Sequence, residues 1–267
     1  MSADLKIQSE RPAQVGLVDR KGQGRPVLYL HGFLGEGLGT PAVDHLAETG
    51  FEVLRPWIPG FQSIDELEGI DGFDDLSFWL VDLLDAEGLA SVAVVGTCLG
   101  GWLAAEFAVR NPARVDRLVL TGAPGIQTER HRPAEFFGIP FDKMAELLFF
   151  DQSQPFAQLM KAASGASGRP IGSGKAVLPF LRSLAATARF AWNPYFVDPK
   201  LEARLGRIGC ETLVVWGAED RFLPVGIGKR WAEMIPRATF VAIPSCGHFP
   251  VLEKPEEWAH QVSAFLA

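Results

Sequence analysis

The feature that most constrains the fold is a regular alternation of short apolar runs with longer stretches of helical periodicity. Four apolar runs fall in the first half of the chain, at residues 27–30, 51–54, 91–96 and 117–120. Between the second and third runs, apolar side chains recur every three or four residues, as they do on one face of a helix. Strand and helix in alternation predict a parallel sheet built by right-handed crossovers. We therefore expect an α/β fold whose mostly parallel sheet is flanked by helices.

One long segment interrupts this alternation. Residues 123–208 contain helical patches but no strong strand, and apolar runs then resume at 212–216 and 239–243. A chain of 267 residues fits a single α/β domain that carries an insertion. The sequence predicts a core formed by residues 1–122 and 209–267, with a helical cap inserted between these two parts.

Composition and charge exclude several classes of protein. Hydrophobic residues make up 48% of the chain and charged residues 21%, which is ordinary for a globular domain. The net charge is −7, and no basic block is longer than two residues, so neither nucleic acid nor an anionic membrane surface is an expected partner. The N-terminal residues are polar, and no apolar run approaches the ~18 residues of a membrane span. We expect a cytoplasmic protein, and the sequence leaves its oligomeric state open.

The cysteines give no sign of a disulfide framework or a metal site. There are three of them (Cys98, Cys210 and Cys246), widely spaced and without a CxxC pair. An odd number at such spacings argues against structural disulfides and against a structural zinc site. No other cluster has the spacing of metal ligands, so we expect neither a metal nor a cofactor.

The sharpest local motif is the hexapeptide Gly96–Gly101, with the sequence GTCLGG. It follows an apolar strand and opens a helix, which is the context of a nucleophile elbow. Small residues two positions before and after Cys98 would let the chain turn sharply, and the N-terminus of the helix would favour a thiolate. The main-chain N–H of Leu99 would then point at a developing oxyanion. The alternative is that Cys98 is a small buried hydrophobic residue in a tight turn.

Two further motifs stand at the ends of other predicted strands. The segment HGFLG follows an early strand and offers a second oxyanion donor, the main-chain N–H of Phe33. Asp220 follows the strand at 212–216, and His248 follows the next strand. A nucleophile, an acid and a histidine in this chain order, all at the carboxyl ends of parallel strands, predict a catalytic triad of Cys98, Asp220 and His248.

The motifs HGFLG, GTCLGG, GAED and GHFP resemble those of the α/β-hydrolase fold superfamily in spacing and context. The resemblance covers nearly the whole chain apart from the cap. It implies a mostly parallel eight-stranded sheet, flanked by helices, with a helical cap after the sixth strand. The segment Trp192–Tyr195, followed by Asp198 and Pro199, resembles the cap exit of the lipase-like and meta-cleavage-hydrolase-like members. The chain is identified as a capped member with cysteine in place of the usual serine nucleophile.

The cysteine is the main departure from the family pattern. A few relatives, notably the dienelactone hydrolases, use cysteine on this fold, so the chemistry remains available. Haloalkane dehalogenases and epoxide hydrolases require aspartate at this position, which argues against both activities. The residues leave open whether Cys98 is native or an engineered replacement of serine.

Four neighbouring residues compete for roles in the site. Glu219 is the second choice for the acid, because the fourth position of the GAED turn is the usual one. His31 is expected to be a structural residue of the HGFLG loop. Glu36 could approach the nucleophile, as a carboxylate does near the thiol in dienelactone hydrolases, or lie in a solvated loop. Cys246 could approach the site or fill a buried position.

The mechanism that these residues favour is acyl transfer to Cys98, with His248 as general base and Asp220 orienting its imidazole. Because a thiolate leaves readily, the substrate needs a good leaving group of its own. We expect a hydrolase acting on a small apolar acyl substrate, namely an activated ester, a lactone or a thioester. The alternatives are an acyltransferase, a serine-type esterase or carbon–carbon hydrolase whose nucleophile was replaced by cysteine, and a non-catalytic binding protein.

Overall fold

The computed structural model describes residue 16 and residues 18–36, 41–164 and 178–267. The described part contains one sheet, whose strands are β1 (Val18–Gly22), β2 (Arg25–Leu30), β3 (Phe51–Pro56), β4 (Val92–Thr97), β5 (Val115–Thr121), β6 (Glu211–Gly217) and β7 (Ala238–Ile243). The α-helices are α1 (Pro41–Glu48), α2 (Phe73–Ala86), α3 (Leu99–Arg110), α4 (Phe141–Leu148), α5 (Pro155–Ala163), α6 (Leu178–Ala191), α7 (Val225–Met234), α8 (Pro250–Glu253) and α9 (Pro255–Leu266). Three short 3-10 helices complete the set: η1 (Ile64–Leu67), η2 (Pro112–Arg114) and η3 (Glu202–Arg207).

The sheet is almost entirely parallel. Its strand order is β1-β3-β2-β4-β5-β6-β7, with β1 antiparallel to β3 and every other neighbouring pair parallel. The expected α/β fold is therefore confirmed. The described residues contribute seven strands, whereas the resemblance implied eight, and residues 1–15 lie outside the described part.

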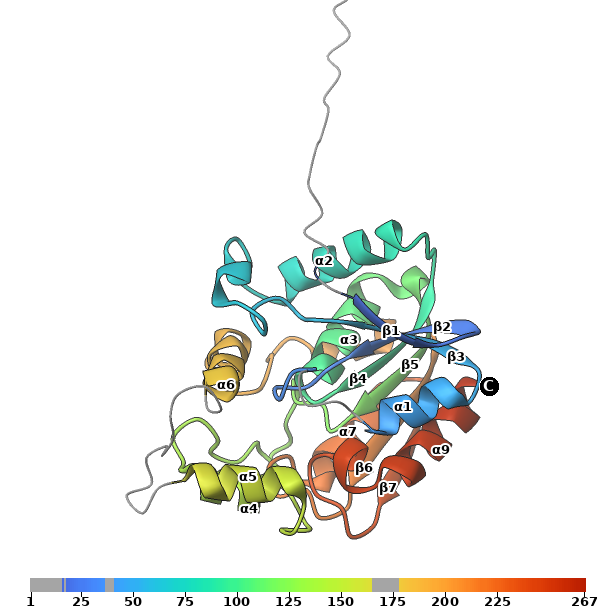
Figure 1. Cartoon of the computed structure of the whole chain (residues 1–267). Coiled ribbons are helices and arrows are strands. Elements are labelled where there is room, and N and C mark those ends of the chain that lie inside the picture. Colours follow the sequence, from blue (N-terminus) through green and yellow to red (C-terminus); the bar gives the residue numbers. More distant parts are fainter. Residues whose placement is uncertain (1–15, 17, 37–40, 165–177) are drawn as a thin grey trace, which may run out of the picture.

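Burial along the sheet follows from this order. Every residue of the central strand β4 is buried, whereas the edge strand β1 is largely exposed. A parallel strand covered by helices on both faces must be apolar throughout, and the sequence VAVVGT satisfies that requirement. On one face α2 packs against α3, and on the other α1 packs against α9 (Figure 1).

Residues 123–208, between β5 and β6, form the segment that we call the β5–β6 segment. Its helices are α4, α5 and α6, which lie beside the sheet in Figure 1. Two contacts fix its position against loops at the carboxyl ends of strands. The ring of Phe136 packs edge-on against Phe33, with 4.8 Å between ring centres, and the main-chain N–H of His248 donates to the carbonyl of Leu148 over 2.7 Å. The described part of the segment therefore contacts the loops that follow β2 and β7.

None of the helices in the described part of the chain combines the length and the apolarity that crossing a bilayer requires.

Candidate active site

The turn between β4 and α3 places Cys98 in an unusual backbone conformation. Cys98 has φ 52° and ψ −120°, which a residue with a side chain seldom adopts. Its N–H donates to the carbonyl of Thr121 at the end of β5 over 2.8 Å, and its carbonyl accepts from Gly101 and Trp102 in the first turn of α3. The strained turn is thus fixed from both sides. Cys98 lies at the carboxyl edge of the sheet and is fully buried.

Glycine is required on both sides of this turn. A Cβ atom at Gly96 would lie 2.3 Å from the carbonyl oxygen of Gly100, and one at Gly100 would lie 2.1 Å from the carbonyl oxygen of Leu30. Gly32 lies directly against Cys98, since a Cβ at Gly32 would come within 3.0 Å of the Cβ of Cys98. The small residues therefore let β2, β4 and α3 meet at a distance that no side chain would permit.

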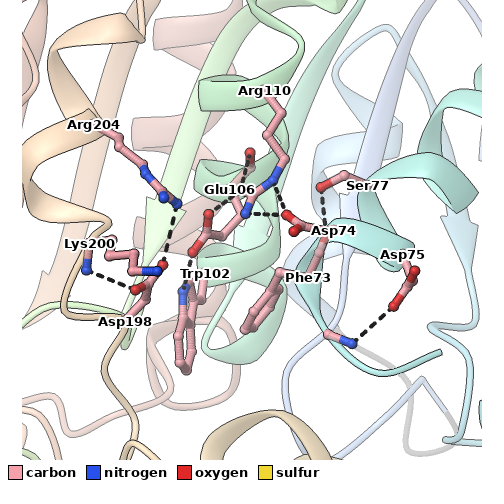
Figure 2. A network of polar contacts seen from close by, with 11 residues as sticks. Phe73, Asp74, Asp75, Ser77, Trp102, Glu106, Arg110, Asp198, Lys200 and Arg204 are labelled. Atoms are coloured by element: carbon pink, nitrogen blue, oxygen red, sulfur yellow. Dashed lines mark hydrogen bonds and ion pairs between the residues drawn. The ribbon is translucent and has the colours of Figure 1, made fainter.

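A buried polar network holds α3, the helix that begins at the turn (Figure 2). The indole Nε1 of Trp102 donates to Oε1 of Glu106 over 3.1 Å, and Arg110 pairs with the same carboxylate. Arg110 also reaches Asp74 in α2, and the ring of Phe73 lies 4.4 Å from that of Trp102. Burial raises the pKa of Glu106, while Arg110 opposes the shift. The network ties α3 to α2 and keeps the helix N-terminus in place beneath the turn.

Asp220 and His248 meet at the ends of β6 and β7. Nδ1 of His248 lies 2.8 Å from Oδ2 of Asp220, and both side chains are fully buried. The other oxygen of Asp220 accepts from the main-chain N–H groups of Phe222 and Leu223, each over 2.9 Å. The carboxylate is therefore held by its own loop and presents one oxygen to the imidazole. Glu219 has a different partner, the main-chain N–H of Cys246, at 3.0 Å.

The charged form of His248 is favoured by its surroundings. Burial alone lowers the pKa of His248, but the neighbouring Asp220 and Cys98 outweigh burial and raise that pKa to about 10. Because Nδ1 is occupied by Asp220, the interaction with Cys98 falls to Nε2. Within the described residues, Nε2 has no hydrogen-bond partner of ordinary geometry. The three predicted residues are therefore brought together, with the imidazole between a carboxylate and a thiol.

The loop after β2 is fixed by a second buried histidine. Nδ1 of His31 lies 2.8 Å from the carbonyl oxygen of Gly32, and Nε2 accepts from the N–H of Ile58 over 3.0 Å. Burial lowers the pKa of His31 to about 4, although the bond to Gly32 opposes the shift. His31 is thus neutral and has no free nitrogen. Its role as a structural residue of the loop fits this geometry.

Two main-chain donors predicted for an oxyanion are free in the described structure. Leu99 is the first residue of α3, where an N–H has no acceptor within the helix. Neither this N–H nor that of Phe33 donates to any acceptor among the described residues. The loop that carries Phe33 approaches the turn through Gly32, so both donors belong to the strand ends that meet at Cys98.

The surroundings of the imidazole are aromatic. The rings of Phe222 and Phe249 lie 4.9 and 4.7 Å from that of His248, both edge-on. Phe33 contacts Phe249 and Phe136, and Phe136 contacts Phe222. A small cavity beside the turn is lined by Tyr29, His31, Thr97, Phe156 and Phe249, among others. Aromatic rings therefore surround the imidazole, whereas the cavity also has polar side chains in its lining.

Two of the competing residues lie in other environments. Glu36 lies 3.7 Å from Arg55, and its buried oxygens accept no hydrogen bond within the described residues. Burial raises the pKa of Glu36 to about 7, against the opposing charge of Arg55. The structure joins Glu36 to Arg55 and shows no contact between it and Cys98. Cys246 is fully buried, and burial raises the pKa of its thiol.

Sequence reasoning missed one residue that bears on His248. Glu253, at the end of α8, accepts hydrogen bonds from main-chain N–H groups on two different segments, one of them next to His248. The only signal in the sequence was an acidic residue five positions after the histidine, which gives no hint of its partners. The three cysteines are free, and no group of three or more potential metal ligands occurs in the described part of the chain.

Comparisons with known proteins identify the family of the fold. A family model described as the alpha/beta hydrolase fold matches residues 25–255. A 2-hydroxy-6-oxo-6-phenylhexa-2,4-dienoate hydrolase from Burkholderia cepacia is 28% identical, with 92% of this chain and 89% of the relative covered. A 2-hydroxy-6-oxononadienedioate/2-hydroxy-6-oxononatrienedioate hydrolase from Paraburkholderia xenovorans is 29% identical, with 92% and 88% covered.

Solved structures show the same fold at lower identity. A bacterial membrane phospholipase A matches with a TM-score of 0.71 at 22% identity, covering 93% of this chain and 81% of that one. A meta-cleavage product hydrolase from Pseudomonas fluorescens matches with a TM-score of 0.68 at 22% identity, covering 93% of both chains. At this level of identity, the likeness extends to the fold alone.

Proposed function

Because the chain belongs to the α/β-hydrolase fold family, and is therefore an α/β-fold hydrolase, we propose that it cleaves a small apolar acyl substrate through an acyl-enzyme on Cys98. The observation that carries the proposal is the arrangement at the strand ends. Asp220 holds Nδ1 of a buried His248 at 2.8 Å, and Nε2 is left for the thiol of Cys98 in its strained turn. A nucleophile, a base and an orienting acid in this geometry suit acyl transfer.

The proposed reaction has two steps. In the first, His248 takes the thiol proton at Nε2, the sulfur of Cys98 attacks the acyl carbon, and the N–H groups of Phe33 and Leu99 stabilise the oxyanion. The tetrahedral intermediate collapses, and the leaving group departs with the proton from His248. In the second step, His248 takes a proton from water, and the resulting hydroxide attacks the thioester. The acid product is released, and the proton returns to the sulfur of Cys98.

The high pKa of His248 bears on the choice of substrate. An imidazole with a pKa of about 10 is charged at neutral pH, so it favours a thiolate beside it. A thiolate is also a good leaving group, and the intermediate returns to reactants unless the substrate's own leaving group is at least as good. Activated esters, lactones and thioesters meet this condition. Plain alkyl esters and amides do not.

The surroundings of the base favour an apolar acyl group. Two phenylalanine rings lie edge-on against the imidazole, with 4.9 and 4.7 Å between ring centres. An apolar acyl group placed against these rings would be stabilised by the burial of its surface. We also propose that the β5–β6 segment acts as a cap over this site, because Phe136 reaches Phe33 and Leu148 accepts from His248.

Carbon–carbon bond hydrolysis is the second candidate, and the sequence comparison favours it. The relatives at 28% and 29% identity, matched over 92% of this chain, are named as hydrolases of dienoate and dienedioate compounds. Those compounds carry carboxylates. A direct comparison of a dienoate with a neutral ester as substrates separates the two candidates.

A burst experiment tests the proposal. The wild-type enzyme mixed with p-nitrophenyl acetate should release about one equivalent of p-nitrophenolate rapidly and then turn over more slowly. Mass spectrometry should find the acetyl group on Cys98. Cys98→Ala should show neither the burst nor the adduct, and the matched control Cys210→Ala should show both. Full activity in Cys98→Ala would overturn the mechanism. Faster product formation with an added alcohol or thiol acceptor would identify an acyltransferase instead.

Replacing the thiol by a hydroxyl decides whether the site is built for sulfur. If it is, Cys98→Ser should lower kcat for a thioester by roughly 10-fold or more, about 1.4 kcal/mol at least, because a hydroxyl gains little from the helix N-terminus before attack. Higher kcat for the serine variant, on both an aryl ester and a thioester, would contradict a site adapted to sulfur. It would also favour the carbon–carbon hydrolase.

A further inference from the structure

Glu253 uses both oxygens of its carboxylate to hold main-chain N–H groups. Oε1 accepts from the N–H of Gly247 over 2.8 Å. Oε2 accepts from the N–H groups of Phe150 and Asp151, over 2.8 and 3.0 Å. The side chain is buried, with 8% of the residue exposed. One carboxylate thus satisfies three main-chain donors that would otherwise lie without partners.

The donors belong to two separate parts of the fold. Gly247 immediately precedes His248 in the loop after β7, whereas Phe150 and Asp151 follow α4 in the β5–β6 segment. A further hydrogen bond joins the same two parts, from the N–H of His248 to the carbonyl of Leu148 over 2.7 Å. Two successive N–H groups therefore hold the loop that carries the imidazole against the end of α4. That of His248 bonds directly, and that of Gly247 bonds through Glu253.

The fit around this junction is tight. A Cβ atom at Gly247 would lie 2.6 Å from the carbonyl oxygen of Leu148, 2.7 Å from the nitrogen of Phe150 and 2.8 Å from Oε1 of Glu253. Only glycine allows the two backbones to approach so closely. Since both backbones and the carboxylate meet within this small volume, a shift of one part must move the others.

A carboxylate suits this position better than a neutral group of the same shape. All three partners are donors, and a carboxylate accepts at both oxygens, whereas an amide accepts at one end and donates at the other. The hydrogen bonds do not remove the cost of burial, which raises the pKa of Glu253. A buried carboxylate is costly, and its hydrogen bonds to the His248 loop and to the end of α4 explain why Glu253 stands at this position.

We propose that Glu253 is a positioning residue that fixes His248 against the end of α4, so that Nε2 remains directed at Cys98. This inference rests on the proposed function, in which His248 is the base. It places Glu253 outside the set of reacting groups, because within the described part of the chain its oxygens accept hydrogen bonds from main-chain N–H groups alone. It also makes the end of α4 part of the support of the base, and so couples the β5–β6 segment to the chemical step.

Three variants test the proposal: Glu253→Gln, Glu253→Asp and the control Glu257→Gln, which changes an exposed carboxylate in the first turn of α9. Glu253→Gln should lower kcat for p-nitrophenyl acetate by about 10- to 100-fold, because a small misplacement of a base has that effect, with KM changed less than about twofold. Glu253→Asp keeps the charge but has a shorter side chain. Its kcat should lie between those of the wild type and of Glu253→Gln. Glu257→Gln should match the wild type.

A spectroscopic readout makes the test independent of turnover. The proton between Nδ1 of His248 and Asp220 should give a low-field proton NMR resonance in the wild type, which His248→Ala removes. The resonance should shift or broaden in Glu253→Gln and remain in Glu257→Gln. If Glu253→Gln and Glu253→Asp keep the wild-type kcat and resonance and only unfold at a lower temperature, Glu253 is merely structural and the proposal is wrong.

The two proposals fail in different ways. Full activity in both Cys98→Ala and His248→Ala would remove the acyl-enzyme mechanism. A shifted resonance in Glu253→Gln would still show that Glu253 positions the imidazole. Conversely, a normal burst in the wild type with an unchanged resonance and kcat in both Glu253 variants would leave the mechanism intact and overturn the positioning role. If Glu253→Gln does not fold, kcat and the resonance of Glu253→Asp are compared with those of the wild type instead.

Discussion

Two loops at the carboxyl edge of the sheet each carry a fully buried histidine, and the two imidazoles behave in opposite ways. After β2, His31 has its pKa lowered to about 4, and both of its nitrogens bond to the main chain. After β7, His248 has its pKa raised to about 10, with Asp220 on one nitrogen and the other left for Cys98. Burial is the same in both loops. The charge of the partners differs.

The contrast teaches that burial alone does not make a reactive histidine. Removing an imidazole from water disfavours its charged form, and two neutral carbonyl and amide partners cannot reverse that effect. An adjacent carboxylate and a thiol can. In the first loop, His31 therefore holds Gly32 and Ile58 together through hydrogen bonds. In the second loop, His248 is a group that can exchange a proton. The predictions below test this division of roles.

The largest expected effect is the loss of turnover in His248→Ala. Removing the base should lower kcat/KM for an aryl ester by about 10³-fold or more, at least about 4 kcal/mol of barrier. Steady-state kinetics on the folded variant, with circular dichroism as a check on the fold, measures this. A variant that kept full activity would remove His248 from the mechanism and end the contrast between the two loops.

The second prediction concerns the stability of the fold against pH. The folded state holds His31 neutral, so the unfolded chain binds more protons between pH 6.5 and about 4, and stability is lost as the pH falls through that window. At about 1.4 kcal/mol per unit of pKa, the loss is about 3 kcal/mol. For His248 the sign is reversed. Its raised pKa stabilises the fold below pH 6.5, and that contribution is lost as the pH rises toward about 10.

Urea unfolding of matched variants separates these two contributions. The acid-side loss should be smaller in His31→Asn than in the wild type, and the alkaline-side loss should be smaller in His248→Ala. Other titrating groups, such as Glu36, are common to the proteins compared and cancel in the difference. An acid-side loss of equal size in His31→Asn and the wild type would show that His31 is not held neutral by the fold.

The third prediction is a smaller loss of turnover in Asp220→Asn. Asparagine can keep its oxygen toward Phe222 and Leu223, but its NH₂ group then faces Nδ1 and favours the wrong tautomer of His248. We expect kcat to fall by about 10- to 100-fold, less than in His248→Ala, because a thiolate supported by a helix N-terminus depends less on an oriented base. The pKa of His248, followed by NMR, should also fall. An unchanged pKa would mean that Asp220 does not set it.

The smallest effect is expected from His31→Asn at neutral pH. Asparagine can still donate to Gly32, but the N–H of Ile58 loses its acceptor, which should cost about 1–2 kcal/mol of unfolding free energy. The value of kcat should stay within about tenfold of the wild type. Chemical denaturation and steady-state kinetics provide the two numbers. A loss of turnover as severe as that of His248→Ala would give both histidines a part in the reaction.

The features of the site that the sequence revealed are those that depend on local chain geometry. The glycines around Cys98 predict a sharp turn because only they fit between β2, β4 and α3, and the structure contains that turn. Asp220 and His248 could be placed near one another because parallel strands end at one edge of a sheet, and their side chains do meet. Periodicity also predicts a helix between the apolar runs at 51–54 and 91–96, where α2 (Phe73–Ala86) is found.

Other features could not be predicted from the sequence, because they depend on contacts between distant parts of the chain. Nothing near Glu253 in sequence shows that Phe150 and Asp151 come to its carboxylate. Glu36 follows the HGFLG loop and could have faced the thiol, but it lies beside Arg55 of β3, the strand that pairs with β2.

The strand order has a consequence for how the protein is made. The thiol belongs to the turn after β4, whereas the carboxylate and the imidazole follow β6 and β7, which extend the sheet beyond β5 near the end of the chain. A ribosome-bound chain that has emerged only as far as β5 therefore carries Cys98 with neither partner. Without His248 beside it, that sulfur lacks the cation that favours its ionised form. Under the proposed mechanism, the thiol therefore becomes reactive last, when synthesis is nearly finished and the protein can already enclose it.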